Sequence, residues 1–301
     1  MSVEYDIGII VLTYNQESIL PRCLESILAQ DTIFSFKIYV VDDASTDRNR
    51  DVIQEYITRF PTKVEGLFHQ TNQYQNGLSP EIPFMKRINV TFFAFCDGDD
   101  FWLTTDKLQK QAELFLRDSG LAIVHTGYKF GVFESNQLTL KSRNQKDILK
   151  AHKTMTAEDF ILGNNVKKST AMVRKSSIDF NFLSKINGQE AHDWLLCISC
   201  AGNGGIMYLE EETAVYQVSD LASFQKKSQL ERIKVKDEVR WYCATHLPDS
   251  QLREKFRSFL LKERLRTMIS HSIFYRCVKP LVMSYRKINL TTRKLIQILI
   301  R

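Results

Sequence analysis

Three carboxylates crowd into one short stretch of the chain. The segment Cys96-Asp97-Gly98-Asp99-Asp100-Phe101-Trp102 directly follows an apolar run that begins at Phe92. Like-charged carboxylates a few ångströms apart raise one another's pKa unless a cation or hydrogen-bond donors offset the charge. Oxygen ligands suit Mg²⁺ or Mn²⁺, and Mg²⁺ commonly completes its coordination with water and substrate phosphate. The stretch is therefore a candidate metal site, although taken alone it is more simply interpreted as an acidic turn that caps the next helix.

Two further polar clusters also follow directly on apolar runs. The β-branched run Ile7–Leu12 ends at Thr13-Tyr14-Asn15, and the run Phe36–Val41 ends at Asp42-Asp43. After each cluster, apolar residues recur at the three- and four-residue spacing of an amphipathic helix. Strands that alternate with helices predict an open, mostly parallel sheet, whose ligands bind beyond the carboxyl ends of the strands. We therefore expect the three polar clusters to lie along one edge of the sheet.

The rest of the chain continues the alternation. Its pattern predicts strands and helices in the order Val64–Phe68 (strand), 108–116 (helix), Leu121–His125 (strand), Thr170–Arg174 (strand) and 194–199 (helix). The polar residues 69–83 predict a loop, and residues 131–155 predict an irregular segment that could serve as a mobile flap. From Ser228 onward the pattern is almost wholly helical, with breaks near Pro248 and Pro280.

The composition is that of an ordinary globular protein. The 301 residues are 44% hydrophobic, with 12 Gly and 6 Pro, which predicts one large or two modest domains. Six cysteines, without a basic N-terminal region and an apolar signal core, favour a reducing cytoplasm. No apolar run reaches the length of a membrane span, so a conventional transmembrane helix is not expected.

The net charge of +6 hides an asymmetry. Residues 221–301 hold 19 Lys/Arg against 6 Asp/Glu, whereas residues 1–220 hold 22 against 29. Between Phe274 and Leu299 the basic residues interleave with apolar ones, as in an amphipathic helix that lies in a membrane interface. Packing against the body of the protein, homodimerisation and a solvated helical face are the alternatives for this segment. No nucleic-acid partner is predicted.

In the order and spacing of three motifs, the chain resembles the family 2 glycosyltransferases. The motifs are Val11-Leu12-Thr13-Tyr14-Asn15, Val41-Asp42-Asp43-Ala44-Ser45-Thr46-Asp47 and the segment from Phe95 to Trp102. The resemblance covers residues 5 to 220 and leaves residues 221 to 301 outside. It implies an α/β protein of GT-A type, with a mostly parallel central sheet flanked by helices in residues 1–220 and a basic α-helical extension in residues 221–301.

The resemblance also implies roles for the motif residues. Asp99 would be the main ligand of Mn²⁺ or Mg²⁺, Asp97 would contact the ribose or the metal, and Asp100 would orient the loop. A bound metal ion stabilises a pyrophosphate leaving group as a Lewis acid. Tyr14, which by itself would be interpreted as a core aromatic, belongs to the implied nucleotide contacts: Thr13, Tyr14, Asn15, Glu17, Asp42, Asp43 and Asp97.

Inverting transfer needs a base that takes the proton of the acceptor hydroxyl, and a carboxylate suits this role. Family members often carry an acidic residue before an aromatic one at the head of a helix after the sheet, and Asp193-Trp194 fits that description. We therefore expect Asp193 to be the base, with Glu190 as the fallback. A purely structural role for Asp193, as a helix N-cap, is the alternative.

One part of the family pattern is missing. Many relatives have Tyr-Arg-x-His beyond the base, whose basic residues help to hold pyrophosphate or metal, but this chain has Tyr216-Gln217-Val218-Ser219. Lys226 or Lys227 is a candidate for the missing charge. The absence leaves open a catalytically inactive relative that only binds sugar nucleotides. A nucleotidyltransferase is a weaker alternative, because no glycine-rich loop follows the first strand.

The resulting hypothesis is an inverting glycosyltransferase with a nucleotide-sugar donor, most simply UDP-linked. The expected acceptor is a glycan or a polyprenyl-linked glycan of an O-antigen or capsule type of surface polysaccharide. Such a protein would be cytoplasmic, and peripheral on the inner face of the cell membrane if the C-terminal helices bind lipid.

Overall fold

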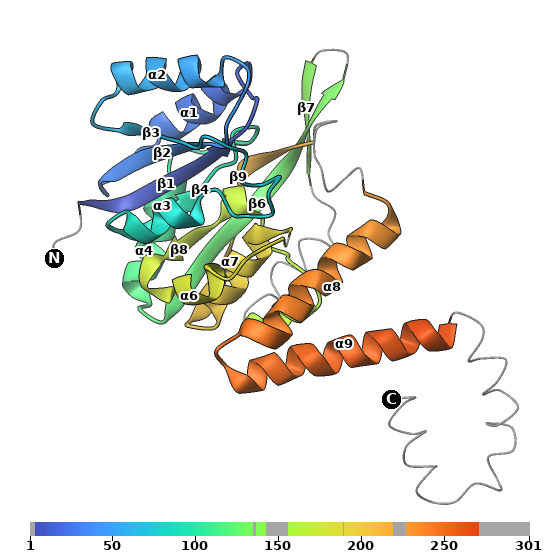
Figure 1. Ribbon diagram of the computed structural model, residues 1–301. Coiled ribbons are helices and arrows are strands. Elements are labelled where there is room, and N and C mark those ends of the chain that lie inside the picture. The colour runs from blue at the N-terminus through green and yellow to red at the C-terminus, as the bar shows by residue number, and fades with distance from the viewer. Residues whose placement is uncertain (1–3, 135–136, 143–155, 189, 219–226, 271–301) are drawn as a thin grey trace, which may run out of the picture. The chain divides into compact units, whose positions relative to one another are not determined.

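The apolar runs near the start of the chain pair as parallel strands in the structure, which is a computed structural model (Figure 1). The central strand β1 has β2 and β4 as its parallel neighbours, and β3 pairs in parallel with β2. Two amphipathic helices, α1 and α2, connect the first three strands. The bounds are β1 (Tyr5–Thr13), α1 (Leu20–Leu28), β2 (Phe36–Asp42), α2 (Asn49–Arg59), β3 (Val64–Phe68) and β4 (Val90–Phe95).

The structure describes residues 4–134, 137–142, 156–188, 190–218 and 227–270. Contacts between residues divide the chain into two compact units, residues 1–239 and 240–301. The predicted boundary after residue 220 falls in the segment 219–226, outside the described residues.

The second half of the sheet is mixed. Its strands continue the order β3-β2-β1-β4-β8-β6-β9-β5, and β7 pairs with β6 off this path. β8 is antiparallel to both β4 and β6, while β6 and β9 are parallel. The bounds are β5 (Phe101–Trp102), β6 (Leu121–Glu134), β7 (Gln137–Ser142), β8 (Met172–Arg174) and β9 (Gly205–Val218). The GT-A type α/β class that the resemblance implies is confirmed by this mostly parallel sheet.

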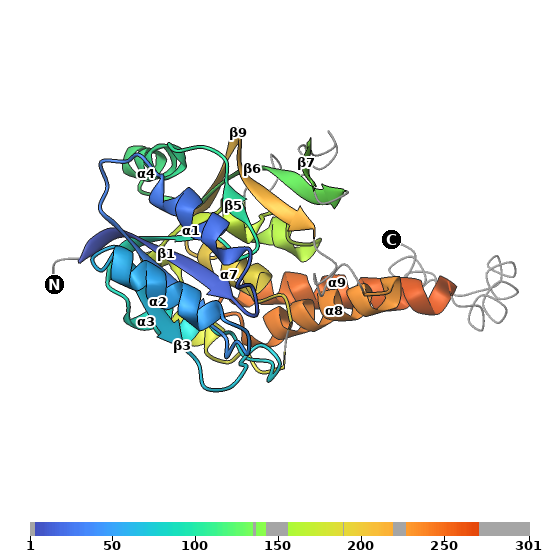
Figure 2. The same ribbon diagram turned by 90° about the horizontal axis from the view of Figure 1, so that it is seen from above.

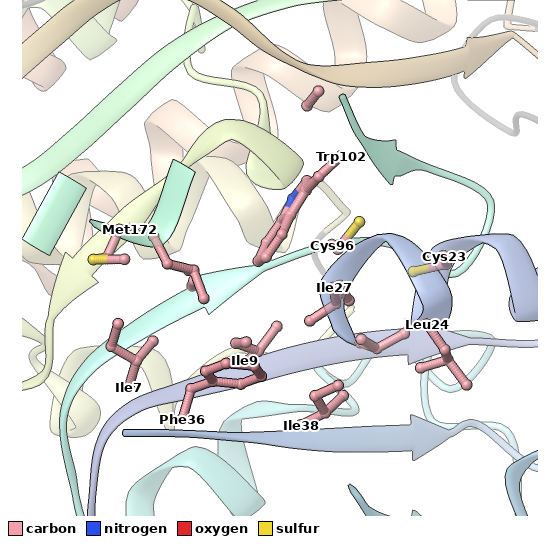
Figure 3. Close-up of a cluster of buried hydrophobic side chains, with 14 of the residues drawn as sticks. Ile7, Ile9, Cys23, Leu24, Ile27, Phe36, Ile38, Cys96, Trp102 and Met172 are labelled. Carbon is pink, nitrogen blue, oxygen red and sulfur yellow. The ribbon is translucent and has the colours of Figure 1, made fainter. Parts of the chain in front are cut away.

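Helices cover both faces of the sheet (Figures 1 and 2). On one face, alternate residues of β1 such as Ile7 and Ile9 pack against α1, α2 and α4, and Figure 3 shows the cluster of buried side chains that results. Each fully buried Ile or Leu of this kind contributes about 1.5–3 kcal/mol through the hydrophobic effect. Further helices in the described part of residues 4–218 are α3 (Ile82–Arg87), α4 (Lys107–Arg117), α6 (Phe180–Leu183), α7 (His192–Ala201) and the 3-10 helices η1 (Ala157–Ile161), η2 (Lys168–Thr170) and η3 (Lys175–Ser177).

The prediction of an irregular flap over residues 131–155 is wrong for its first part. β6 extends to Glu134 and β7 pairs with it from Gln137 to Ser142 in an antiparallel ladder, with Gly131 opposite Leu140. The polar residues of this segment alternate on an exposed two-stranded ribbon, so polarity alone did not indicate a loop. Residues 143–155 lie outside the described part of the chain.

The described part of the C-terminal segment, residues 227–270, is mostly helical, as expected. Helix α8 (Gln229–His246) ends before Pro248, and α9 (Ser250–Ser270) begins after Asp249, whose Oδ1 accepts the backbone N–H of Gln251 at 2.7 Å. In the second unit Arg257 donates to the carbonyl oxygen of Ala244 at 2.9 Å. Of the helices in the described ranges, none combines the length and the apolar character needed to cross a membrane. The amphipathic region from 274 to 299 and the predicted break at Pro280 lie outside these ranges.

Candidate active site

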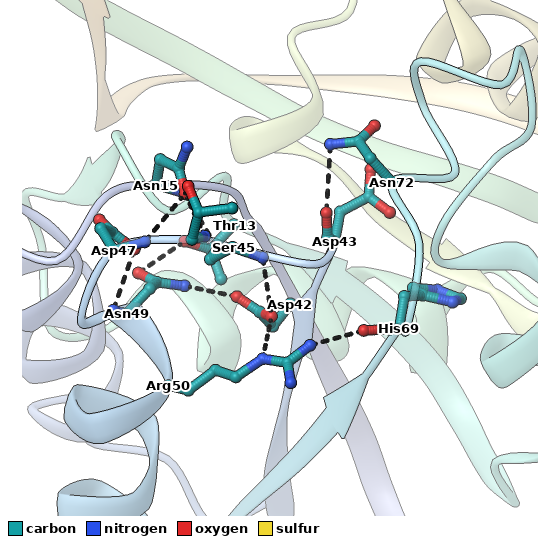
Figure 4. A network of polar contacts seen from close by, with 11 residues as sticks. Thr13, Asn15, Asp42, Asp43, Ser45, Asp47, Asn49, Arg50, His69 and Asn72 are labelled. Carbon is teal, nitrogen blue, oxygen red and sulfur yellow. Dashed lines mark hydrogen bonds and ion pairs between the residues drawn. The ribbon is translucent and has the colours of Figure 1, made fainter.

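Motif side chains connect the loop that follows β1 to the loop that follows β2 (Figure 4). Asn15 donates its backbone N–H to Ser45 Oγ at 2.9 Å, and its Oδ1 accepts the backbone N–H of Thr46 at 2.7 Å. Glu17 accepts the backbone N–H of Arg48 through Oε2 at 2.6 Å. The two predicted nucleotide contacts Asn15 and Glu17 therefore also fix the shape of the loops that would receive a nucleotide.

Asp42 is fully buried at the end of β2, where it lies opposite Thr13 in the strand register. Its Oδ1 accepts from Asn49 Nδ2 at 2.9 Å, and its Oδ2 accepts from Arg50 Nε at 3.0 Å and from the backbone N–H of Ser45 at 3.2 Å. Thr13 in turn donates its hydroxyl to Asn49 Oδ1 at 3.3 Å. Both carboxylate oxygens of Asp42 thus accept hydrogen bonds from other groups of the protein.

Asp43 and Tyr14 lie at the same edge of the sheet. Asp43 accepts the backbone N–H groups of Gln73 and Tyr74 at 2.7 and 3.0 Å, so it fixes the loop of residues 69–81. Tyr14 has 38% of its surface exposed, and the interpretation as a core aromatic is wrong. An exposed tyrosine beside the ends of β1 and β2 presents a ring that a base can stack against.

Backbone strain gathers around this edge. The described residues include three non-glycine residues with positive φ: Asn15 at 52°, Ala44 at 61° and Ala191 at 59°. Asn15 and Ala44 belong to the two loops described above, and Ala191 directly precedes α7. Such conformations cost about 1–3 kcal/mol each and cluster at functional sites, where the surrounding structure enforces them.

The acidic motif forms a tight turn at the end of β4. The backbone N–H of Gly98 donates to the carbonyl oxygen of Leu12 at 2.8 Å, and the N–H of Asp100 donates to that of Asp97 at 2.8 Å. A Cβ atom on residue 98 would lie only 2.4 Å from Gln16 Oε1. The glycine therefore allows the turn to pack closely on the loop that follows β1.

Asp100 ties this turn to two other elements. It is buried, accepts the hydroxyl of Ser169 through Oδ2 and accepts the backbone N–H of Gln217 through Oδ1 at 2.9 Å. Burial, together with the charges of Asp99 and Asp97, raises the pKa of Asp100 well above its ordinary value. Asp100 thus orients the loop, as expected.

Asp97 and Asp99 remain partly accessible to solvent, and their carboxylates repel each other electrostatically. Burial and then the charge of Asp97 raise the pKa of Asp99 to about 6, and burial also raises the pKa of Asp97. Carboxylates in this state fit a hard divalent cation, which would offset their repulsion. Nowhere in the described ranges are three His, Cys, Asp or Glu side chains grouped to hold a metal ion by themselves. A metal on Asp97 and Asp99 would therefore need oxygen ligands from substrate and water.

Lys168 provides a cation beside the acidic turn. Its Nζ lies 2.8 Å from Glu81 Oε1 and 3.3 Å from Asp97 Oδ1. Burial opposes the charge of Lys168, but Asp97, Glu81 and Asp193 outweigh it and raise its pKa. Burial would likewise raise the pKa of Glu81, yet Lys168 lowers it to about 2.

The expected base, Asp193, belongs to the same charged cluster. It lies in the first turn of α7, whose N-cap is Ala191, so the alternative of Asp193 as the N-cap is wrong. Its Oδ2 accepts from Asn164 Nδ2 at 2.9 Å, and its charge contributes to raising the pKa of Asp97. The structure thus brings together two carboxylates that are nearly a hundred residues apart in the sequence.

The fallback base and the expected substitute cation pair with each other. Glu190 Oε1 lies 3.1 Å from Lys227 Nζ, whereas Lys226 and Ser219 lie outside the described residues. In the stretch that replaces the family's Tyr-Arg-x-His pattern, Gln217 accepts from the guanidinium of Arg22 through Oε1. Arg22 stacks on Phe101, with 4.4 Å from its Cζ to the ring centroid, and therefore places a positive charge next to the acidic turn.

Residues at this site that were not predicted include Arg22, Lys168 and Ser169. The last two precede β8, which runs antiparallel to β4 with Met172 opposite Ala94. The start of β8 therefore lies at the carboxyl end of β4, beside the acidic turn. The sequence predicted the strand Thr170–Arg174 but not that it runs antiparallel to β4. With that direction known, Lys168 would have been placed beside the acidic turn.

Known proteins resemble this chain in sequence and in fold. A family model described as Glycosyl transferase family 2 matches residues 8–180, more than half of the chain. The chain belongs to glycosyl transferase family 2. An uncharacterized protein of Mycobacterium tuberculosis is 26% identical over 214 residues, which are 70% of this chain and 58% of that protein. This family 2 chain therefore spans little more than half the length of that relative.

Solved structures share the fold. TarS residues 1–349 of Staphylococcus aureus, in complex with UDP-GlcNAc, has a TM-score of 0.62 at 19% identity, covering 96% of this chain and 77% of that one. The mannosyltransferase PcManGT of Pyrobaculum calidifontis, in complex with GDP-Man and Mn²⁺, has a TM-score of 0.59 at 13% identity, covering 98% and 84%. By sequence, the poly(ribitol-phosphate) beta-N-acetylglucosaminyltransferase TarS is 34% identical over 95 residues, 31% of this chain and 16% of that protein.

Proposed function

We propose that this family 2 member is an inverting glycosyltransferase that moves a sugar from a nucleoside diphosphate sugar to a hydroxyl of a surface glycan. The observation that carries the proposal is the meeting of Asp97, Asp99 and Asp193 in one charged cluster at the carboxyl edge of the sheet. The loops after β1 and β2 end at the same edge. This arrangement supplies a nucleotide site, a place for a leaving diphosphate and a base.

The proposed donor site lies along the loops that carry Tyr14 and Asp43. Tyr14 offers an exposed ring for stacking, and Asp43 stands beside it with each carboxylate oxygen already accepting one backbone N–H. Because a carboxylate oxygen has two lone pairs, Asp43 retains the capacity to accept a further N–H from a base. TarS is named in complex with UDP-GlcNAc and PcManGT with GDP-Man, which supports a nucleotide sugar as donor and UDP as the first candidate.

Asp97 and Asp99 are the proposed ligands of Mn²⁺ or Mg²⁺. A divalent ion bound there would act as a Lewis acid that stabilises the negative charge of the departing diphosphate. Asp100 holds the turn in shape through its two hydrogen bonds. The presence of Mn²⁺ in the PcManGT complex supports a divalent metal ion as the cofactor.

Asp193 is the proposed base. Asn164 holds its Oδ2 atom, which leaves Oδ1 to take the proton of the acceptor hydroxyl as the hydroxyl oxygen attacks the anomeric carbon. The proton passes to the carboxylate, the glycosidic bond to the diphosphate breaks and the nucleoside diphosphate leaves. The name of TarS, poly(ribitol-phosphate) beta-N-acetylglucosaminyltransferase, supports a polymer as the class of acceptor.

A panel of UDP-, GDP- and dTDP-sugars, with and without Mn²⁺, tests the proposal through thermal shift and donor hydrolysis. We expect Asp193→Asn to bind the donor as the wild type does and to lose turnover by at least about 100-fold, the usual contribution of a general base. Glu190→Gln is the matched carboxylate control and should retain turnover. Unchanged turnover in Asp193→Asn, with loss in Glu190→Gln, would move the base to Glu190. A wild-type protein that binds donors without turnover would instead be the inactive relative.

A further inference from the structure

We propose that Lys168 is a positioning residue of this site, which fixes the carboxylate of Asp97 for metal and diphosphate binding, and that Glu81 holds Lys168 in place. The inference rests on the proposed function of the same site. Lys168 lies in η2, outside the three motifs that carry the family resemblance, and its contacts with Glu81 and Asp97 single it out.

The contact geometry defines a chain of three charged groups. Glu81, Lys168 and Asp97 follow one another at 2.8 and 3.3 Å, and the side chains of Glu81 and Lys168 are only 4% and 9% exposed. Asp97, at 36% exposed, is the member that reaches the surface of the site. Ser79 donates its hydroxyl to the second oxygen of Glu81 at 3.0 Å, so the far end of the chain is fixed as well.

The backbone that carries Lys168 is braced against the acidic turn. Ser169, the next residue, donates its hydroxyl to Asp100 and accepts the backbone N–H of Asp97 at 3.3 Å. Its carbonyl oxygen accepts the indole N–H of Trp102 at 3.0 Å, and that of Thr170 accepts from Gln111 at 2.9 Å. A lysine on so constrained a backbone has little freedom to leave Asp97.

The ion pair between Lys168 and Asp97 acts on a proposed metal ligand without contacting the metal itself. Groups that hydrogen-bond to a ligating carboxylate orient it, and their removal typically costs about 10–100-fold in metal affinity or activity. Lys168 contacts Oδ1 of Asp97, and Oδ1 is therefore the oxygen that the lysine constrains. The same ammonium offsets part of the repulsion between Asp97 and its acidic neighbours, which include Glu81 and Asp193.

The effect of Lys168 on the charge of the site can be separated from its effect on the position of Asp97, because Glu81 and Lys168 carry opposite charges. Replacing Lys168 alone makes the site one unit more negative, which by itself attracts a divalent cation. Replacing both residues leaves the net charge of the site unchanged, so only the positioning effect remains. Neutral or apolar replacement of a buried ion pair is often tolerated, whereas removal of one partner leaves a buried unpaired charge and destabilises the fold.

The decisive experiment compares the double variant Glu81→Gln/Lys168→Met with the wild type, using the full chain. Calorimetry measures the affinity for UDP or GDP at saturating Mn²⁺ and again in EDTA, and a Mn²⁺ titration at saturating nucleotide gives the apparent metal affinity. Thermal unfolding reports the fold. The matched control is Lys37→Met/Glu65→Gln, which removes another Lys–Glu pair of 2.7 Å between β2 and β3.

We expect the Glu81/Lys168 double variant to unfold near the wild-type temperature and to lose about 10-fold or more in nucleotide and Mn²⁺ affinity, whereas the control pair loses none. Binding in EDTA should change little, since it depends on the loops after β1 and β2. The apolar version, Glu81→Leu/Lys168→Met, gives a second background if the first does not fold. Wild-type affinity for both Mn²⁺ and nucleotide in either folded double variant overturns the inference. A wild-type protein that binds no nucleotide would overturn the proposed function instead.

Discussion

Lys107 permits a sharp physical test of the packing behind the acidic turn. It is fully buried in the first turn of α4, where its Nζ donates to Gln111 Oε1 at 2.6 Å and lies 4.4 Å from the ring centroid of Trp102. None of the ion pairs found in the described ranges includes Lys107. Burial lowers the pKa of Lys107 to about 7.

The sign of the resulting pH dependence follows from proton binding. In the unfolded chain Lys107 has its ordinary pKa of 10.5, so between pH 7 and 10.5 the unfolded state binds more protons than the folded state. The contribution of Lys107 to the free energy of unfolding therefore rises with pH through this window. At about 1.4 kcal/mol for each pH unit, the rise from Lys107 amounts to at most about 4–5 kcal/mol.

Lys107→Met removes this dependence and fills a similar volume. Near pH 7 the variant avoids the cost of the buried charge, but it leaves Gln111 Oε1 without its donor, at about 1–3 kcal/mol, and loses the cation–π contact with Trp102, at about 1 kcal/mol. We expect the variant to be about 1–2 kcal/mol more stable than the wild type near pH 6–7 and less stable by about 1–3 kcal/mol near pH 10.

Urea unfolding of both proteins, followed by tryptophan fluorescence at several pH values between 6 and 10.5, measures the difference. Taking the difference cancels the titration of all other groups. A difference that stays constant across this range would refute the assignment of a depressed pKa to Lys107, and the reasoning from its burial would fail with it.

Variants at three further positions, with their controls, test the site. Asp100→Ala loses two buried hydrogen bonds and should lower the free energy of unfolding by about 2–5 kcal/mol in urea, while Asp100→Asn should lose less than half of that. Gly98→Ala forces close contacts with the loop after β1 and should cost about 1–3 kcal/mol and weaken nucleotide binding, whereas Gly202→Ala, which meets nothing closer than 3.6 Å, serves as its control. Glu81 has a pKa of about 2 beside Lys168, so its contribution is present above pH 4.5 and lost as the pH falls toward 2. Between pH 4.5 and 2 the free energy of unfolding of Glu81→Gln should therefore fall by up to about 3 kcal/mol less than that of the wild type. Equal pH dependence of the two proteins in acid unfolding would contradict the ion pair.

The parts of the fold that could be predicted are those with one dominant pattern. β1 and β2 are apolar runs buried on both faces, and α1 carries a clear apolar stripe with Leu20, Leu24 and Ile27 buried. The rule that ligands bind at the carboxyl ends of parallel strands then placed Thr13, Asp42 and the acidic turn at one edge. The register that sets Thr13 opposite Asp42 agrees with that expectation.

The missed elements lacked such a pattern. β9 is 14 residues long, but Glu210, Glu211 and Glu212 interrupt its alternation, and the register with β6 shifts around Thr126 and Gly127. β5 has only two residues. α3 has six residues with Pro83 at its start, too few for a helical period to emerge. Such elements form because the neighbouring strands and helices define their places, and that information is not local in sequence.

The loop of residues 69–81 illustrates what local reasoning omits. In sequence it belongs to the polar stretch of residues 69–83, which was predicted only as a loop, and the last two of these residues begin α3 instead. In the structure Asp43 holds the backbone of Gln73 and Tyr74, while the ring of Tyr74 packs edge-on against His192 at the start of α7, with 5.8 Å between centroids. The loop therefore connects Asp43, the proposed contact to the nucleobase, with α7, the helix that carries the proposed catalytic base Asp193.

The same loop reaches the acidic turn through its last residue, because Glu81 binds Lys168 and Lys168 binds Asp97. Near its middle, the carbonyl oxygen of Gly77 accepts the backbone N–H of Gly188 at 2.9 Å, and a Cβ on residue 77 would lie 2.5 Å from the Cα of Gly188. Asp97 acquires a fixed counter-charge from this arrangement, and the segment before α7 acquires a fixed position. The acidic turn is thus more than three crowded carboxylates: Asp100 anchors it, Asp99 and Asp97 remain partly accessible, and Lys168 links it to the loop of residues 69–81.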